Sequence, residues 1–466
     1  MSAQAAPPTP ILVDPNPGVL RWTLHAAYDL CWILAVLLAS PWWILRCATT
    51  PRFRAMASAR LGFGLPRPPA PGARPRILIH GVSVGEVKAA QSLVRALAAS
   101  RPDLEIVIST TTDTGLSVAR RLYTDSTVVR FPLDLSPVVS RFLDRVAPVC
   151  VVLVELEIWP NFLRQANRHG VPVAVVNGRI TGRSFGHYHR FRDLLPQFNR
   201  LTLLCVQDEE YAARFGDLVG SRERILVTGN IKADGLRTGT VDPGAELAAL
   251  LGARDGQRTL VAGSTHDPEE RLVVQACARA ADGVRLILVP RHPERAAAVV
   301  RELTALGSPP QLLSRLRAGE VPDPSRPALV DTMGELEHVY ALADVVFVGG
   351  SLVAHGGQNV LEPAAQGKPV VHGPNLWNFA QEEALLAKAG ASRRVEDEAG
   401  LERALAEILG DDGVRTRMAR AGIAAVQAQK GATEVTNRAL LDRCLPPEAR
   451  ARDPRGAGPG RVHLVC

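Results

Sequence analysis

Short, nearly uninterrupted apolar runs alternate with amphipathic segments along most of this chain. One series extends from RILIH (76–80) to RILVTGN (224–230), and a second extends from RTLVAGS (258–264) to KPVVHG (368–373). Strands that are apolar on both faces must be covered on both faces, as in a parallel sheet flanked by helices. Two series of similar size therefore predict an α/β protein with two doubly wound domains, in which ligands bind at the carboxyl ends of the strands.

Pro- and Gly-rich connections divide the chain into parts. The segment 64–74 is rich in Pro, Gly and Arg, and a Gly/Asp-rich connection at 235–244 separates the two series of strands. Such composition is typical of linkers and turns. We expect an N-terminal anchor and linker at 1–64, a Rossmann-like domain at 65–236, a second Rossmann-like domain at 237–445 and a flexible tail at 446–466.

The composition is that of a globular protein with an anionic partner. Apolar residues make up 46% and charged residues 22%, which excludes a disordered, collagen-like or coiled-coil chain. The formal net charge of +7 favours phosphates or an acidic lipid surface, whereas no basic block is dense enough to indicate nucleic acid. The 7 cysteines form no CxxC pair, so the sequence indicates neither a disulfide framework nor a zinc site.

An apolar segment near the N-terminus predicts a membrane anchor. The stretch 30–45 carries no charge, and its extension to 22–45 adds only His25 and Asp29 as strongly polar residues. The shorter stretch reaches about 24 Å and the longer one would span a hydrocarbon core of roughly 30 Å, so a spanning helix and an interfacial helix both stay open. The arginines that follow place the rest of the chain in the cytoplasm. A simple tether predicts that deletion of residues 1–50 leaves both domains folded.

Acidic residues follow the strands of the first half. The HGVSVGE motif ends in Glu86, in the first turn of a helix, where the helix dipole favours an ionised carboxylate that can act as a general base. A first-turn Glu can equally serve only as a helix cap. VELEIWP places Glu155 and Glu157 at the end of a buried strand, where carboxylates must face a polar cleft or pair with cations. GNIKAD adds Lys232, whose side chain could be merely solvated.

The second half carries a glycine-rich segment that predicts a nucleotide site. In VVFVGGSLVAHGGQNVLEPAAQGKPVVHGP (345–374) a strand meets two Gly pairs, and Asn359 and Glu362 then open a helix. Backbone N–H groups in such a turn can cradle a phosphate, and a helix-opening Glu can accept hydrogen bonds from ribose hydroxyls. LVPRHPER supplies Arg291 as a phosphate contact, although an Arg at a strand end is often only surface.

These motifs together resemble those of the Kdo (3-deoxy-D-manno-octulosonic acid) transferases of lipopolysaccharide assembly. The matching motifs, in chain order from about residue 20 to about residue 440, are HGVSVGE, VELEIWPNF, GNIKAD, LVPRHPER, DTMGEL, FVGGSL, GGQNVLEPA and GPNLWNF. The resemblance implies a membrane anchor followed by two Rossmann-like domains of the GT-B type. It implies transfer of Kdo from CMP-Kdo to lipid IVA at the cytoplasmic face of the inner membrane, with inversion at the anomeric carbon. CMP-Kdo is then a co-substrate, and neither a cofactor nor a metal is expected.

The same resemblance assigns roles to individual residues. Glu86 resembles the catalytic base of the family, and Glu155 and Lys232 resemble its transition-state stabilising pair. The implied CMP-binding residues are Pro290, Arg291, His292, Met333, Gly334, Glu335, Asn359, Val360, Leu361 and Glu362. The run 177–181 departs from the NARLS-like run of the family, and Gln358 stands where His is common. Both departures concern acceptor contacts rather than donor chemistry.

Two other classes of protein share part of this pattern. A GT-B enzyme that uses a UDP-sugar, or a UDP-sugar epimerase, has the same two-domain plan and the late Gly/Glu segment, but HGVSVGE and GNIKAD speak against it. A non-catalytic, membrane-tethered nucleotide-binding module would keep the second half and need no carboxylate at residue 86. Binding assays with CMP and UDP distinguish the first alternative, and loss of transfer in Glu86→Ala would exclude the second.

Overall fold

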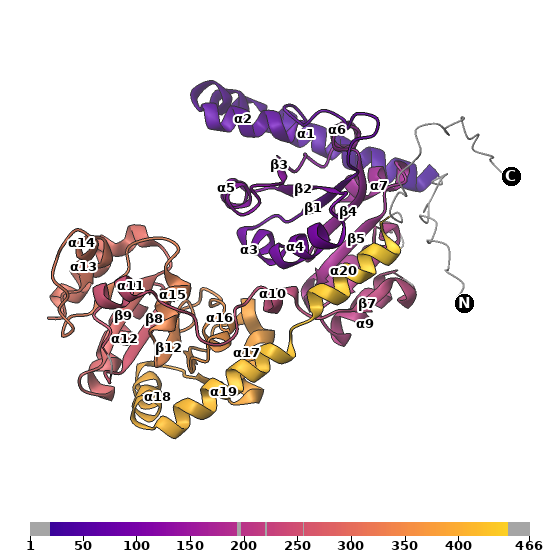
Figure 1. Cartoon of the computed structure of the whole chain (residues 1–466). Coiled ribbons are helices and arrows are strands. Elements are labelled where there is room, and N and C mark those ends of the chain that lie inside the picture. The colour runs from indigo at the N-terminus through magenta and orange to yellow at the C-terminus, as the bar shows by residue number, and fades with distance from the viewer. Residues whose placement is uncertain (1–18, 193–196, 220, 255, 446–466) are drawn as a thin grey trace. The chain divides into compact units, whose positions relative to one another are not determined.

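A computed structural model describes residues 19–192, 197–219, 221–254 and 256–445 (Figure 1). The tail predicted at 446–466 lies outside the described residues. The chain forms two compact units. Unit 1 comprises the chain up to Gly235 together with the segment that begins at Gly431, and unit 2 comprises Leu236–Lys430.

Unit 1 is built on a parallel sheet of 7 strands in the order β3-β2-β1-β4-β5-β6-β7. The strands are β1 (Arg76–His80), β2 (Glu105–Thr110), β3 (Thr127–Arg130), β4 (Pro148–Val154), β5 (Val173–Gly178), β6 (Leu203–Val206) and β7 (Ile225–Val227). The helices are α1 (Val19–Thr49), α2 (Pro51–Arg60), α3 (Val84–Ala89), α4 (Gln91–Ser100), α5 (Asp113–Leu122), α6 (Ser136–Val146), α7 (Pro160–Arg168), α8 (Gly182–Phe191), α9 (Glu209–Val219), α10 (Ile231–Asp234) and α20 (Ala432–Arg443). Leu78 packs in one apolar cluster, whereas Ile77 and Ile79 pack in another, so both faces of the sheet are covered.

Unit 2 repeats this plan with a parallel sheet in the order β10-β11-β9-β8-β12-β13-β14. The strands are β8 (Thr259–Thr265), β9 (Arg285–Pro290), β10 (Gln311–Leu312), β11 (Ala328–Leu329), β12 (Val345–Val348), β13 (Val370–His372) and β14 (Ser392–Arg394). The helices are α11 (Ala245–Leu250), α12 (Glu269–Ala280), α13 (Ala296–Ala305), α14 (Leu313–Arg317), α15 (Leu336–Ala341), α16 (Leu361–Ala365), α17 (Ala380–Ala389), α18 (Glu398–Gly410) and α19 (Asp412–Ala428). The two doubly wound parallel sheets predicted from the sequence are confirmed.

Helix α20 corrects the predicted domain boundary. The sequence predicts a second domain at residues 237–445, but the chain from Gly431 onward belongs to unit 1. Leu440 is fully buried in an apolar cluster of unit 1, where α20 packs on α4 (Figure 1). The Asp234 carboxylate accepts hydrogen bonds from the N–H groups of Gly431 (2.7 Å) and Thr433 (2.6 Å). Apolar periodicity shows that a helix is buried, but it does not show which sheet the helix covers.

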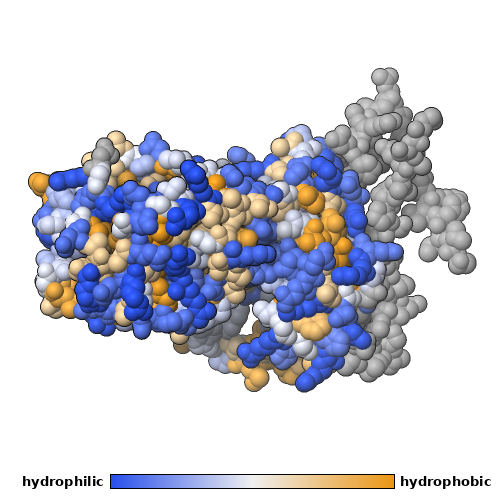
Figure 2. All heavy atoms as spheres, turned by 90° about the horizontal axis from the view of Figure 1, so that it is seen from below, coloured by the Kyte–Doolittle hydropathy of each residue, from blue (hydrophilic) through white to orange (hydrophobic). Residues whose placement is uncertain are grey.

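Helix α1 carries the apolar segment that the sequence predicted as an anchor. Among the described residues, one helical stretch, Trp22–Thr49 within α1, has the length and composition needed to cross a membrane. None of the residues in an apolar segment of 18 residues within this stretch is buried inside the protein. Leu38 is 83% exposed and Ile44 is 68% exposed. By contrast, the face of the molecule in Figure 2 is largely hydrophilic, with apolar residues in small separate patches. Exposed apolar side chains along one helix indicate an interaction surface.

Polar side chains in the first turns of α1 bind it to unit 1. The Asp29 carboxylate accepts hydrogen bonds from the backbone N–H (3.0 Å) and the hydroxyl (2.6 Å) of Ser136, and from Nδ2 of Asn161 (2.7 Å). The Tyr28 hydroxyl donates to Asp134 (3.0 Å), whose carboxylate also accepts the backbone N–H of Asn161 (3.1 Å) at the start of α7. These hydrogen bonds connect α1 to unit 1, so deletion of residues 1–50 would remove contacts of the folded unit, and the expectation that both domains stay folded without this segment stays a prediction.

Loss of the Asp29 contacts should destabilise unit 1. We expect Asp29→Ala to lower the free energy of unfolding by about 1–3 kcal/mol, because Ser136 and Asn161 lose a charged acceptor. Denaturant unfolding in detergent would measure this effect, with alanine at the exposed Asp125 as the matched control. Equal unfolding midpoints for the two variants would contradict the role of Asp29.

Candidate functional site

Glu86 lies where strand β1 ends and helix α3 begins. Its carboxylate accepts hydrogen bonds from the N–H of Val82 (2.6 Å) and the hydroxyl of Ser83 (2.9 Å), while the Ser83 oxygen accepts the N–H of Glu86 (3.3 Å). Gly81 allows this approach, because a Cβ there would lie 3.0 Å from the Glu86 Cβ. Burial raises the pKa of Glu86, although these hydrogen bonds oppose the shift. The helix-capping contacts therefore exist, and they fix the orientation of the carboxylate.

Glu155 is clamped between two cations directly after strand β4. Lys232 Nζ lies 2.7 Å from Oε1 of Glu155, and Arg179 Nε lies 2.7 Å from Oε2. The Glu155 side chain is 9% exposed, and its backbone has a φ of 66°, which is uncommon for a residue other than glycine. The predicted association of Glu155 with Lys232 is present. Arg179 is a third member, although the sequence analysis noted the run 177–181 only as a departure from the family pattern.

Asn177 connects the end of strand β5 to the helix that carries Lys232. Its buried Oδ1 accepts the N–H of Ile231 (3.1 Å), and Oδ1 of Asn230 caps α10 by accepting the N–H of Lys232 (3.0 Å). Asn177 also has a positive φ of 54°, a conformation that Asn adopts more readily than most residues. The position of Lys232 is therefore set by the ends of two elements rather than by its own side chain alone.

Glu157 adds a third carboxyl group at the same edge of the sheet. Strands β1 and β4 are neighbours and run parallel, so the residues that follow them lie close together. Burial, reinforced by the charges of Glu86 and Glu155, raises the pKa of Glu157 to about 7, and Trp159 Nε1 donates a hydrogen bond to it (3.0 Å). This edge of unit 1 combines three carboxyl groups with two cations.

In unit 2 the predicted CMP-binding segments follow strands β9, β11 and β12; β9 and β12 flank strand β8, and β11 lies beside β9. After Pro290 ends β9, the N–H of Arg291 donates to the carbonyl of Thr265 (3.0 Å), and the side chains of Arg291 and His292 are exposed. In the segment after β11, Met333 is exposed, Gly334 has a φ of 94°, and the Glu335 carboxylate pairs with Arg317 (2.8 Å). These residues therefore gather at one carboxyl edge.

The segment 359–362 opens helix α16. Oδ1 of Asn359 accepts the N–H of Leu361 (3.1 Å), and Nδ2 of Asn359 donates to the Glu362 carboxylate (3.2 Å). Val360 and Leu361 are buried in the apolar core of unit 2, so their side chains serve packing. Asn359 and Glu362 are the two members of this predicted set whose side chains carry polar groups on a partly exposed surface.

The first glycine pair does not form the phosphate cradle that its sequence predicted. The N–H groups of Gly350, Ser351 and Leu352 all donate to the carboxylate of Glu269, at distances of 2.6, 3.0 and 2.9 Å. An internal carboxylate therefore occupies the position that a phosphate was expected to take. Sequence reasoning missed Glu269, although an acid at the start of the helix after strand β8 is the same signal that identified Glu86.

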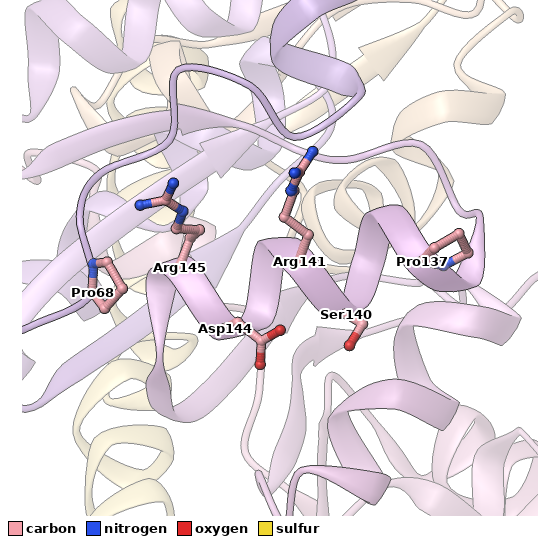
Figure 3. A pocket seen from close by; sticks show the side chains of 6 residues that line it. All are labelled: Pro68, Pro137, Ser140, Arg141, Asp144 and Arg145. Carbon is pink, nitrogen blue, oxygen red and sulfur yellow. The ribbon is translucent and has the colours of Figure 1, made fainter.

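A shallow cavity of about 530 Å³ lies elsewhere in unit 1. It is lined by Pro68, Pro137, Ser140, Arg141, Asp144 and Arg145 (Figure 3). Arg141 and Arg145 extend from one side of α6, whereas Asp144 points to the other side. This cavity lies along a helix rather than at the carboxyl ends of the strands. Among the described residues, no group of three or more His, Cys, Asp or Glu side chains is arranged to hold a metal ion.

Comparison with known proteins places the chain in a class and then in a family. The two doubly wound units define a GT-B-like protein, and the crystal structure of UDP-GlcNAc 2-epimerase from Neisseria meningitidis shares this fold with a TM-score of 0.54 and 12% identity, covering 78% of this chain and 99% of that one. Residues 56–235 match the family model of the 3-deoxy-D-manno-octulosonic-acid transferases. This chain belongs to the Kdo transferase family.

Two relatives of known name support membership of the Kdo transferase family. The 3-deoxy-D-manno-octulosonic acid transferase of Haemophilus influenzae is 34% identical over 402 residues, which cover 83% of this chain and 90% of the relative. The enzyme of the same name from Bordetella pertussis is 34% identical over 450 residues, which cover 91% of this chain and 99% of the relative. The identity therefore extends through both units.

Proposed function

We propose that this protein transfers Kdo from CMP-Kdo to lipid IVA, with inversion at the anomeric carbon and without a metal or other cofactor. The observation that carries the proposal is the carboxylate of Glu86, held by Val82 and Ser83 at the carboxyl edge of the sheet beside the clamped Glu155. Membership of the Kdo transferase family supports Kdo as the transferred sugar.

In the proposed mechanism, Glu86 accepts the proton of the acceptor hydroxyl as that oxygen attacks the anomeric carbon of Kdo. The bond from this carbon to the phosphate oxygen of CMP-Kdo breaks at the same time, and CMP leaves with the bonding electrons. A single displacement needs one base and inverts the configuration, whereas retention by double displacement needs a second carboxylate free to act as nucleophile. Both carboxylate oxygens of Glu155 are engaged by cations, at 2.7 Å each. Glu155 is therefore suited to fixing charge rather than to attack.

Lys232 and Arg179 supply positive charge that is fixed before the reaction begins. Preorganised charges stabilise a transition state because they need no reorganisation as its own charge develops. The Lys232 side chain is 24% exposed and that of Arg179 is 41% exposed, so both cations keep a surface that substrate can contact. We assign these two cations, held by Glu155, to the stabilisation of the charges that develop during transfer.

The acceptor proposal also places the protein at a membrane. Lipid IVA is a lipid, and the exposed apolar part of α1 can hold the enzyme at the surface that contains it. Arg46, Arg52 and Arg54 follow the apolar segment, which under the positive-inside rule supports the cytoplasmic face of the inner membrane.

The donor part of the proposal predicts the effect of two substitutions in unit 2. We expect Glu362→Ala and Arg291→Ala each to weaken CMP binding by roughly 10- to 100-fold, because each removes a charge-assisted hydrogen bond to ribose or phosphate. Titration calorimetry with CMP would measure this, with UDP as the competing nucleotide and alanine at the exposed Glu407 and Arg301 as matched controls. Tighter binding of UDP than of CMP, or unchanged CMP affinity in both variants, would contradict the proposed donor site.

A further inference from the structure

The carboxylate of Glu269 is fully buried beside the predicted donor segments. Glu269 is the first residue of helix α12 and has no exposed surface. Besides the N–H groups of Gly350, Ser351 and Leu352, it accepts the N–H of His266 (2.9 Å). Four backbone donors from two segments therefore converge on one side chain.

Backbone N–H groups that could bind an external anion here bind a carboxylate of the protein itself. Successive N–H groups that point to one place form a concave site for an anion. Burial raises the pKa of Glu269, whereas the four backbone hydrogen bonds lower it, and such bonds are the compensation that a buried carboxylate requires. Here the protein supplies its own anion, and the three N–H groups of residues 350–352 are used to hold the loop.

The glycine pair at the start of this loop has a packing reason. A Cβ at Gly349 would lie 2.5 Å from the Cα of Thr265, and Gly350 has a φ of 67°. Gly349 is required because the loop crosses the end of strand β8 at close range, and Gly350 is favoured because its backbone is in the left-handed region. The glycines bring the loop to Glu269 rather than to a ligand.

Further hydrogen bonds extend the fixed region toward helix α16. The Ser351 hydroxyl oxygen accepts the N–H of Gly373 (2.8 Å), and the Ser351 carbonyl accepts the N–H of Asn375 (2.9 Å). The Gly350 carbonyl accepts the N–H of Gly357 (2.8 Å), two residues before Asn359. The conformation of residues 350–352 therefore determines where the chain enters the segment with Asn359 and Glu362.

We infer that Glu269 is a positioning residue of the donor site, which holds the loop 349–357 so that Asn359 and Glu362 are presented to the nucleotide sugar. This inference rests on the proposed function for the identity of the donor. Glu270, the residue after Glu269, also fixes a predicted donor segment. Its buried carboxylate binds Arg295 (2.8 Å) and accepts a hydrogen bond from the Thr265 hydroxyl (2.9 Å), which secures the end of the segment 290–295.

The experiment compares Glu269→Gln, Glu269→Asp and the control Glu407→Gln, an exposed acid on α18 of the same unit. Hydrogen exchange of the amides of residues 350–352 is measured first, without any ligand. We expect these amides to exchange at least about 10-fold faster in Glu269→Gln, because an amide side chain replaces a charged acceptor, and to be unchanged in Glu407→Gln. Glu269→Asp keeps the charge and should lie between the two.

Steady-state kinetics then test the link to the donor. We expect Glu269→Gln to lower kcat/KM for CMP-Kdo by roughly 10- to 100-fold while the KM for lipid IVA stays constant, with partial recovery in Glu269→Asp. A general loss of structure would instead lower the apparent kcat/KM for both substrates equally, because it reduces the concentration of active enzyme and changes neither KM. If Glu269→Gln does not fold, Glu269→Asp provides both measurements.

The two proposals fail in distinguishable ways. If the unaltered protein does not use CMP-Kdo, the proposed donor is wrong, whereas the exchange measurement still tests the contact between Glu269 and the loop. Unchanged exchange in Glu269→Gln would overturn the positioning role. Faster exchange with unaltered kinetics for CMP-Kdo would overturn the connection between this loop and the donor site.

Discussion

Replacement of Glu86 by glutamine is expected to lower the rate of Kdo transfer by about 10²- to 10⁴-fold, the range that general-base catalysis contributes. Glutamine keeps the size of the side chain and can still accept a hydrogen bond from Val82, but it cannot take the proton of the acceptor hydroxyl. CMP affinity should stay unchanged, because the predicted nucleotide residues lie in unit 2. Single-turnover transfer and CMP titration of the same preparation would measure the two effects.

The pH dependence of turnover gives the base assignment a second test. Burial raises the pKa of Glu86, and a base acts only when it is deprotonated. Activity should therefore fall, as the pH is lowered, at a higher pH than an ordinary glutamate would give. Glu209→Gln, on the exposed start of α9, is the matched control and should retain the normal rate and profile. A Glu86→Gln enzyme with normal turnover would contradict the assignment.

Replacement of Lys232 by glutamine is expected to lower kcat by about 10²- to 10³-fold, the typical effect of removing one preorganised charge-stabilising group. The substitution leaves the buried Glu155 with Arg179 as its cationic partner, so we also expect a lower unfolding temperature. Glu155→Gln should lower kcat as well, because both cations lose the anion that fixes them.

The distinction between turnover and binding decides the role of this cluster. Lys88→Gln, at an exposed position of α3 in the same unit, is the matched control and should keep the normal kcat. An increase in KM with normal kcat in the Lys232 and Glu155 variants would identify these residues as substrate clamps instead.

Much of the fold could be predicted because central strands are long and apolar on both faces. The apolar runs that predict strands are 76–80, 105–110, 149–157, 171–177, 201–207 and 224–230 in the first series and 258–264, 284–292, 327–331, 344–350 and 368–373 in the second. They do not include β3, β10 and β14, each of which lies at an edge of its sheet. Edge strands are short and are covered less completely, so their residues do not form a continuous apolar run; TVVR in β3 is one example. Helix α20 was assigned to the wrong unit because amphipathic periodicity does not identify the partner sheet.

The site was predictable where it depends on strand ends and unpredictable where it depends on side-chain contacts between distant segments. Glu155 and Lys232 follow β4 and β7, which are not neighbours in the sheet, and their pairing was implied by the family resemblance rather than by the order of the strands. Arg179 was not identified, because no motif spacing links it to Glu155. Glu269 was not identified either, although it begins the helix after β8 as Glu86 lies in the first turn of the helix after β1. The glycine pair was interpreted as a phosphate cradle, whereas its N–H groups bind an internal carboxylate.

The most direct test of the central claim is mass spectrometry of lipid IVA after incubation with the purified full-length protein and CMP-Kdo. The account predicts a lipid product heavier by one or more Kdo residues, with CMP released in equal number, in the presence of a metal chelator. The same product should be absent with Glu86→Gln over the same time. Unmodified lipid IVA with the unaltered protein, or transfer from a UDP-sugar in place of CMP-Kdo, would contradict the account.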